Sequence, residues 1–255
     1  MRKRTIIPFV IAAFVAGACG DKHSKSGDAN AAEVTTVSPE TSGVSTPTGP
    51  VTPGPVSFEG AQAAFADKRY DDAVRLFTSY TSAQPENVWG FYMLGLSAWK
   101  TGDRDAAVRA FTQALEKDST HVKSRLNLSR VLIEQGKAQE ALPHVEATLK
   151  IDSASSESYR LLGRVQTELG DSSAAIEAFK RAIVLDERDA WSMNNLAKVY
   201  IGQGRFEEAL GPLARAIEID STVAAFHTNL GRALERTADG SRLAEAFVEQ
   251  VKTWR

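Results

Sequence analysis

The chain has 255 residues, of which 43% are hydrophobic, so it is long enough to bury a substantial core. Its formal net charge of −2 argues against a general attraction to nucleic acid or to anionic membranes. The single cysteine, Cys19, excludes an internal disulfide and a cluster of thiolate ligands around a metal.

The first 18 residues have the composition of a secretory signal peptide. Residues 2–4 are basic, residues 5–15 are almost entirely apolar, and residues 16–18 are small, as a cleavage site requires. The apolar run is too short for a stable membrane-spanning helix, and it contains Pro8. We therefore expect export, and an uncleaved anchor is the alternative.

The residues around Cys19 refine this expectation. Residues 15–19, with the sequence VAGAC, resemble the bacterial lipobox, and this resemblance implies cleavage before Cys19 and acylation of it. Several acyl chains would hold the protein firmly on a bilayer. The lipobox favours leucine where this chain has Ala16, and Ala16 with Ala18 also suits the ordinary signal peptidase, which would release a soluble protein. Gly20 replaces the aspartate that signals inner-membrane retention in enterobacteria, so the outer membrane is the expected location.

Residues 19–56 form the second segment. From residue 20 onward this segment has no Phe, Trp or Tyr, and five of the nine prolines fall between Pro39 and Pro55. Such a composition cannot bury enough apolar surface to offset the entropy of ordering. We expect a disordered tether between the membrane and a folded part at residues 57–255.

In residues 57–255, several columns of residues recur every 34 positions. The leucines of this period are Leu94, Leu128, Leu162, Leu196 and Leu230; the glycines are Gly102, Gly136, Gly170 and Gly204; the alanines are Ala73, Ala107, Ala141, Ala175 and Ala209. A fixed period of this length indicates a stacked helical repeat, in which each unit buries its apolar face against its neighbours.

The second unit carries Phe91, Leu94, Gly95, Phe111 and Ala114 at the offsets of the tetratricopeptide repeat (TPR) signature. The chain therefore resembles this family. The resemblance implies an all-α fold, a right-handed superhelix of about six helix-turn-helix units over residues 57–255. The last helix, at residues 241–254, is expected to cap the array.

The columns have expected mechanical roles. The glycine column should end each first helix in a left-handed turn. Small residues should let the two helices of a unit approach closely: Gly95, Ser129, Gly163, Ala197 and Gly231. Large residues should fill the space between successive units: Phe77, Phe111, Val145, Phe179 and Leu213.

In the resembled family the first helices line a concave groove. At positions expected to face it, a basic side chain recurs every 34 residues: Arg130, Arg164, Lys198 and Arg232. One helical turn earlier lie Asn127, Leu161, Asn195 and Asn229. Nearer the N-terminus the same face carries Trp89, Tyr92, Leu96 and Trp99.

We interpret these residues as a peptide-binding groove with an aromatic end and a basic, asparagine-rich end. Asparagine amides can bond the backbone of an extended peptide, Arg and Lys can pair with its carboxylates, and aromatic side chains can supply apolar contact. The alternative is an ordinary solvated helix face.

The residues of common enzymes are missing from the sequence. The four histidines lack the spacing of zinc ligands, and there is neither a phosphate-binding glycine loop nor a serine or cysteine nucleophile motif. We expect no catalysis, no metal, no cofactor and no small-molecule substrate.

The sequence thus favours a lipid-anchored periplasmic adaptor that binds proteins or extended peptides. Envelope lipoproteins built from such repeats assist the assembly of pili and secretins. The alternatives are a soluble periplasmic chaperone-like binder and a recruiter of peptidoglycan hydrolases.

Overall fold

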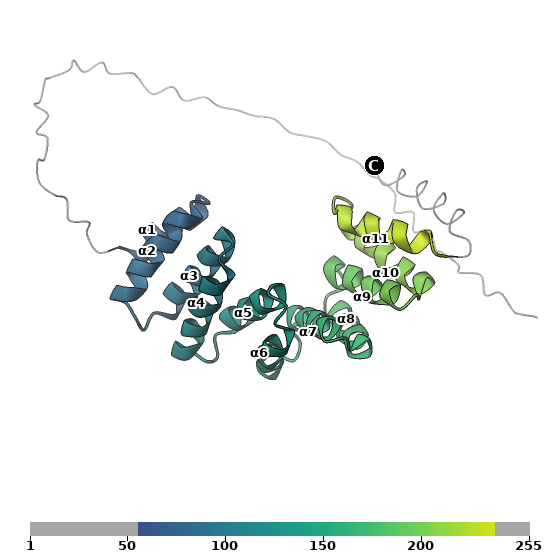
Figure 1. Cartoon of the computed structure of the whole chain (residues 1–255), viewed down its shortest axis with the longest axis horizontal. Helices are drawn as coiled ribbons and strands as arrows, with labels where there is room; N and C mark the ends of the chain where they lie inside the picture. The colour runs from purple at the N-terminus through teal and green to yellow at the C-terminus, as the bar shows by residue number, and fades with distance from the viewer. Residues whose placement is uncertain (1–55, 238–255) are drawn as a thin grey trace, which may run out of the picture. The chain divides into compact units, whose positions relative to one another are not determined.

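A computed structural model describes residues 56–237, and all of its regular structure in that range is helical (Figure 1). The first helices of the pairs are α1 (Phe58–Ala66), α3 (Val88–Thr101), α5 (Val122–Glu134), α7 (Ser156–Glu168), α9 (Ala190–Gly202) and α11 (Ala224–Leu234). The second helices are α2 (Tyr70–Ala83), α4 (Arg104–Lys117), α6 (Ala138–Ile151), α8 (Ser172–Leu185) and α10 (Phe206–Ile219). The all-α array of stacked pairs is confirmed.

Several sequence predictions concern residues that the structure does not describe. The signal peptide, Cys19, the tether and the capping helix at residues 241–254 lie outside residues 56–237. The described range holds five complete pairs and the first helix of a sixth. None of its helices is long and apolar enough to cross a membrane.

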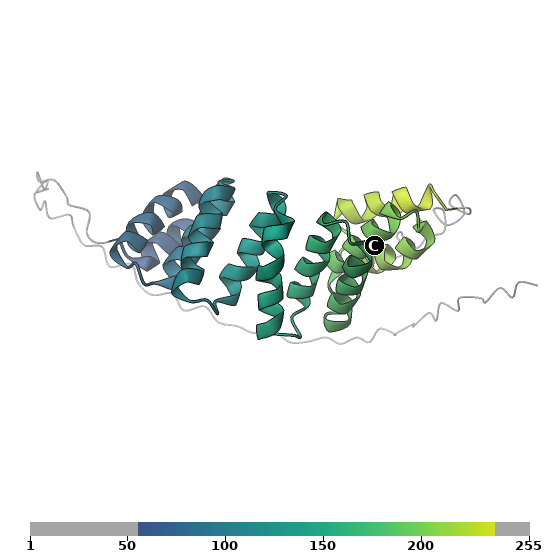
Figure 2. The ribbon, with the colours of Figure 1, turned by 60° about the horizontal axis from the view of Figure 1, so that its bottom comes forward.

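The helix contacts explain how the pairs are stacked. Each helix packs against the next one along the chain, and each first helix also contacts the first helix of the following pair (Figures 1 and 2). Within residues 56–237 the second helices make no such contact with one another. Successive first helices are therefore close together, whereas successive second helices are farther apart. We call the exposed surface of the first helices the inner face and that of the second helices the outer face.

The glycine column ends the first helices as predicted. Gly102, Gly136, Gly170 and Gly204 have φ angles of 88°, 73°, 82° and 72°. In each case the following residue donates its N–H to a carbonyl near the helix end, as Asp103 does to Ala98 at 3.0 Å. In the first pair this position belongs to Lys68, which has φ 61° and is followed by the same type of bond, from Arg69 to Ala64 at 2.9 Å.

The turns between pairs are built on an aspartate column. The side chains of Asp118, Asp152, Asp186 and Asp220 each accept a hydrogen bond from the backbone N–H two residues later, at 2.8 to 3.0 Å. For Asp118 and Asp220, the hydroxyl of the threonine two residues on adds a second bond, and these bonds lower the pKa of both carboxyl groups. Such side-chain bonds to the local backbone stabilise the turns between pairs.

The core follows the repeat. The five alanines of the 34-residue column are fully buried, and so are Phe77, Phe111, Val145, Phe179 and Leu213. The large residues also have a role that the sequence did not indicate. The ring of Phe111 packs against Gly95 of its own pair, and the ring of Phe179 packs against Gly163. They thus fill the space inside a pair as well as the space toward the next one, where Phe111 shares a cluster with Leu126.

Candidate functional site

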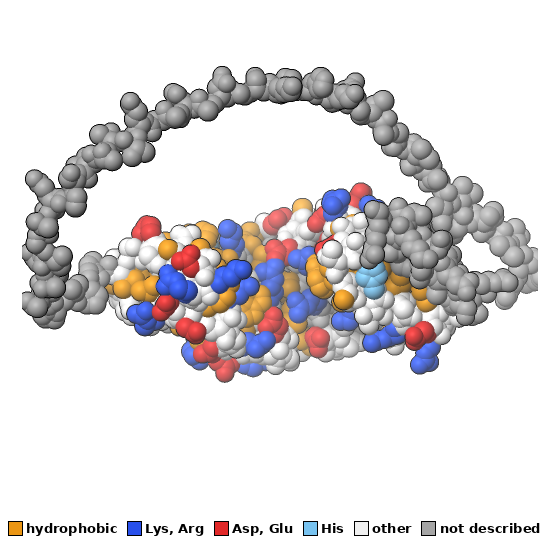
Figure 3. Space-filling model, turned by 90° about the horizontal axis from the view of Figure 1, so that it is seen from above, with side chains coloured by type: hydrophobic (Ala, Val, Ile, Leu, Met, Phe, Trp, Pro, Cys, Tyr) orange, Lys and Arg blue, Asp and Glu red, His pale blue; other side chains and the backbone are white. Residues whose placement is uncertain are grey.

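The inner face is where the predicted groove residues lie. Figure 3 views the molecule from above and shows Lys and Arg side chains gathered over the middle of the array, with acidic and hydrophobic side chains beside them. The first helices that supply this surface contact one another directly, so side chains of neighbouring pairs come within reach of each other.

Three arginines form the centre of this surface. Arg130 lies on α5, and Arg160 and Arg164 lie one helical turn apart on α7. Burial lowers the pKa of Arg130, and the charges of Arg160 and Arg164 lower it further. Burial also lowers the pKa of Arg164, while Glu134 and Glu168 act in the opposite direction. The three guanidinium groups thus lie close enough together in a half-buried place to influence one another, and which of them can take a ligand depends on the partners that each already has.

Two of the three guanidinium groups already have partners. Arg130 pairs with Glu157 and donates to Asn127 Oδ1 at 2.6 Å. Arg160 Nη1 donates to Asp189 Oδ1 at 2.8 Å, and the carboxylate of Asp189 is almost fully buried.

Arg164 is different. It is half-buried, and it makes no hydrogen bond or ion pair with any residue between 56 and 237. The planar fork of a guanidinium can bind a carboxylate through two parallel hydrogen bonds. Arg164 is therefore the member of the cluster best placed to receive a ligand.

The asparagines have a different arrangement from the basic residues. Asn127 is buried, and its Nδ2 donates to the Tyr92 hydroxyl at 3.4 Å. Asn229 is buried and donates to Asn194 Oδ1 at 2.8 Å. Both bonds join neighbouring first helices across 35 residues, so these amides hold the array together. Asn195 is half-buried, whereas Leu161 is buried in the core and lies away from the surface.

Trp89 and Tyr92 form an aromatic cluster at the start of α3. The Trp89 side chain is 47% exposed, and its ring meets that of Tyr92 edge to face at 5.5 Å. His121 packs against both rings, at 4.9 Å and 5.4 Å, and Lys123 Nζ lies 5.1 Å from the Trp89 ring centre. Burial lowers the pKa of His121, whose Nδ1 accepts the Ser124 N–H and so caps α5.

Trp99 lies at the other end of α3, away from this cluster. Trp99 is ten positions after Trp89 in the helix, which is about 15 Å along the axis. Trp99 Nε1 donates to Glu134 Oε2 at 3.0 Å, and Arg104 Nε donates to the same oxygen at 3.1 Å. The predicted aromatic end is therefore split into two parts: the exposed Trp89 with the half-buried Tyr92, and Trp99, which is hydrogen-bonded to Glu134 of α5.

The C-terminal part of the predicted ladder is more exposed. Lys198 and Arg232 are both exposed, on α9 and α11. Trp191, which was not among the predicted site residues, is 51% exposed on α9 and packs edge to face on Phe226 at 5.2 Å. It lines a 250 Å³ cavity with Arg160, Asp189 and Phe226. The signal for it was in the sequence, because Trp191 lies three 34-residue periods after Trp89.

Metal ligation has no support among the described residues. Within residues 56–237 no three His, Asp or Glu side chains come close enough together to hold a metal ion. What the inner face offers is a half-buried cationic centre between two exposed tryptophans, which suits an extended chain with carboxylate and apolar side chains.

Known structures share this architecture. MamA of Desulfovibrio magneticus is 20% identical, with a TM-score of 0.59 over 64% of this chain and 93% of that one. TTC0263 of Thermus thermophilus, described as a thermophilic TPR protein, is 22% identical, with a TM-score of 0.57 over 71% and 97% of the two chains. YrrB, described as a TPR protein with an unusual peptide-binding site, is 18% identical, with a TM-score of 0.56 over 67% and 88%. The comparison with curated proteins found no match.

The tetratricopeptide repeat profile matches the sequence three times, at residues 92–156, 126–190 and 160–224. These overlapping matches begin 34 residues apart and together cover more than half of the chain, in register with the helix pairs of the structure. The chain belongs to the tetratricopeptide repeat family, whose stacked helix pairs are scaffolds for protein–protein interaction.

Proposed function

We propose that this protein is a membrane-anchored periplasmic adaptor that binds an extended segment of a partner protein along its inner face. Arg164 carries the proposal, since it is a half-buried cation inside an arginine cluster and has no partner among residues 56–237. The bound segment has a carboxylate at Arg164 and apolar side chains against Trp89 and Trp191. YrrB, a relative by fold, is described as having a peptide-binding site.

The binding part of the proposal is tested with short fluorescent peptides in extended, non-helical sequences. One set combines glutamates with tryptophan or leucine, and a matched set has glutamine in place of glutamate. We expect the acidic set to bind the full chain more tightly. The double variant Arg164→Ala with Lys198→Ala should weaken that binding about tenfold or more, the loss expected for a charge-assisted pair.

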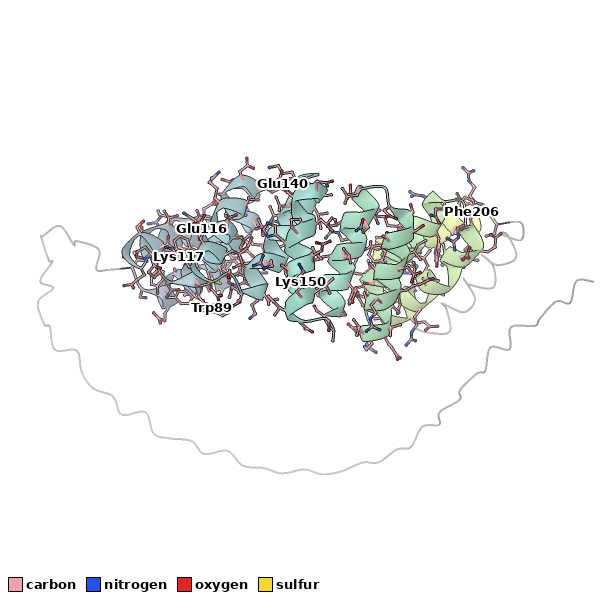
Figure 4. The ribbon with its side chains drawn as sticks, turned by 90° about the horizontal axis from the view of Figure 1, so that it is seen from below. Trp89, Glu116, Lys117, Glu140, Lys150 and Phe206 are labelled. Carbon is pink, nitrogen blue, oxygen red and sulfur yellow. The ribbon has the colours of Figure 1, made fainter. Side chains whose placement is uncertain are left out.

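The control for this experiment is Lys150→Ala. Lys150 is an exposed lysine on α6, labelled on the outer face in Figure 4, and its removal changes net charge without touching the inner face. Circular dichroism should show equal helicity for all variants. Equal affinity of the double variant and the wild type for the acidic peptides would overturn the binding site.

The anchoring part rests on the first 19 residues, where the lipobox-like sequence ends at Cys19. In a bacterial host, the wild type should partition into detergent and Cys19→Ser should remain in the aqueous phase. Aqueous partitioning of both forms would support the soluble chaperone-like alternative. A role in pilus or secretin assembly, or in recruiting peptidoglycan hydrolases, is a further choice that cross-linking at Arg164 in the envelope can decide.

A further inference from the structure

An apolar pocket opens on the outer face, away from the arginine cluster. Its volume is 490 Å³, and it lies between the second helices α8 and α10 with α9 as its floor. Its lining residues are Lys180, Ile183, Val184, Met193, Leu196, Gly211, Pro212 and Arg215. Met193 and Leu196 are buried at the bottom, whereas the Val184 side chain is 67% exposed at the mouth.

The repeat shows that the fold does not require this pocket. The positions equivalent to Val184 in the other described pairs are polar or charged: Ser82, Glu116, Lys150 and Glu218. Glu116 and Lys150 are labelled on the outer face in Figure 4. Those pairs stack in the same way without an apolar residue there, so the exposed Val184 adds nothing that the stacking needs.

Gly211 leads to the same conclusion. A Cβ atom at this position would meet nothing within 4 Å, and Gly211 has no left-handed backbone that would demand glycine. A glycine inside a helix is destabilising relative to alanine, because its backbone loses more conformational freedom on folding. The equivalent positions carry larger residues: Arg75, Arg109, Pro143 and Glu177. The missing side chain therefore destabilises α10 slightly and leaves the mouth of the pocket open.

The charges around the pocket indicate the chemistry of its occupant. Lys180 and Arg215 line it, and no carboxylate does. Lys180 lies 3.4 Å from Glu177 and Arg215 lies 2.7 Å from Glu218, each along its own helix. Such exposed ion pairs contribute little to stability, so an incoming carboxylate can replace the intrahelical partner.

We propose that this pocket binds an acidic amphipathic helix of a second partner protein. A large apolar side chain of that helix enters between Val184 and Gly211, and its flanking carboxylates pair with Lys180 and Arg215. Helices dock into apolar grooves in this way, through anchors one turn apart on a single face. Because the inner and outer faces are separate, the array can hold two proteins at once.

The test uses a fluorescent amphipathic peptide with leucines at i, i+3, i+4 and i+7 and glutamates on both flanks, with a matched peptide that has lysines instead. We expect the full chain to bind the acidic peptide and to bind the basic one at least about tenfold more weakly. Gly211→Leu fills the mouth of the pocket and should weaken binding of the acidic peptide by about tenfold or more. Because a Cβ atom at this position meets nothing within 4 Å, the leucine should leave the packing of α10 intact, and equal helicity in circular dichroism checks this.

The matched control is Arg109→Leu, which introduces the same leucine at the equivalent position of α4. This variant should leave peptide binding unchanged. Gly211→Leu should weaken binding by the same factor in an Arg164→Ala background, which separates this pocket from the inner-face site. Equal binding by Gly211→Leu and the wild type, or equal binding of the acidic and basic peptides, would overturn the proposal. Self-association of the full chain in sedimentation that Gly211→Leu abolishes would identify the occupant as a second copy and overturn it too.

Discussion

Gly95 on α3 lies directly against the ring of Phe111 on α4, and a Cβ atom on Gly95 would be 2.6 Å from two carbons of that ring. Gly163 and Phe179 repeat this relationship two pairs later. Where the small position is Ala197, the opposite residue is Leu213 instead of phenylalanine. In the pairs of Gly95 and Gly163 the missing side chain makes room for the phenylalanine ring, and this close contact fixes the distance between the two helices of those pairs.

Gly95→Ala should therefore lower the free energy of unfolding by about 2 kcal/mol, the usual cost of overpacking a core. The double variant Gly95→Ala with Phe111→Leu should recover part of this loss, because it copies the combination of Ala197 with Leu213. Gly211→Ala is the control, since its Cβ has free space and the helix gains propensity. Urea unfolding measures all three, and a stabilising Gly95→Ala would contradict the close contact.

Lys68 should be replaceable by glycine with a gain in stability. It has a positive φ of 61°, where an L side chain costs about 1 kcal/mol. We expect Lys68→Gly to raise the free energy of unfolding by up to about 1 kcal/mol, reduced by the greater freedom of glycine in the unfolded chain. Lys198→Gly, in the middle of α9, should lower it by about 1 kcal/mol. If Lys68→Gly and Lys198→Gly changed the free energy of unfolding in the same direction, this would argue against a left-handed turn at Lys68.

The buried carboxylate of Asp189 should contribute more to stability than an exposed helix cap. Asp189 accepts from Arg160, from the Ser192 N–H and from the Ser192 hydroxyl, and its side chain is 1% exposed. We expect Asp189→Ala to cost about 3 kcal/mol, because it leaves a half-buried guanidinium without its partner. Asp103→Ala removes an exposed cap of α4 and should cost about 1 kcal/mol. Thermal unfolding should therefore separate the two variants clearly.

The stability of the array should fall in mildly acidic solution. Burial lowers the pKa of His121 and of His144 below the ordinary value of 6.5. The folded protein thus prefers neutral imidazoles, and the unfolded chain takes up protons first as the pH drops. The contribution of these two histidines to the free energy of unfolding is fully present above pH 6.5, the ordinary histidine pKa that applies in the unfolded chain. It is lost as the pH falls through the lowered pKa values of the folded protein.

His121→Asn tests this effect, since asparagine keeps a cap on α5 and does not titrate in this range. The double variant His121→Asn with His144→Gln should flatten the dependence of the urea midpoint on pH between 7.5 and 5.5, a window chosen around the histidine value. An unchanged slope in the double variant would assign the pH dependence to other groups.

The fold could be predicted because the residues that determine it recur with a fixed period along the sequence. The columns of alanine, glycine and large apolar residues each act within one pair or between neighbours, so the sequence records every contact several times. Lys68 was not predictable as a left-handed residue from its side chain, because only its place in the glycine column shows it.

The candidate site was less predictable for a physical reason. The sequence shows which side chains share a face, but not which of them bind one another. Asn127 and Asn229 lie on the predicted helices, but their side-chain amides donate hydrogen bonds to residues of the neighbouring first helices. Arg130 pairs with Glu157 and Arg160 pairs with Asp189, whereas Arg164, in the same ladder as Arg130, has no such partner between residues 56 and 237. Such pairing depends on distances between helices that no single column encodes.

The alternation of contacts along the array also has a mechanical consequence. Each pair contacts the next one through its own first and second helices, both of which pack on the first helix of the following pair, whereas successive second helices make no contact within residues 56–237. A change of angle between adjacent pairs should therefore be accommodated most easily on the outer face. Rotation at many junctions adds up, and a small change at each one winds or unwinds the whole row. We therefore expect the array to be able to adjust its curvature to the length of the segment that it binds.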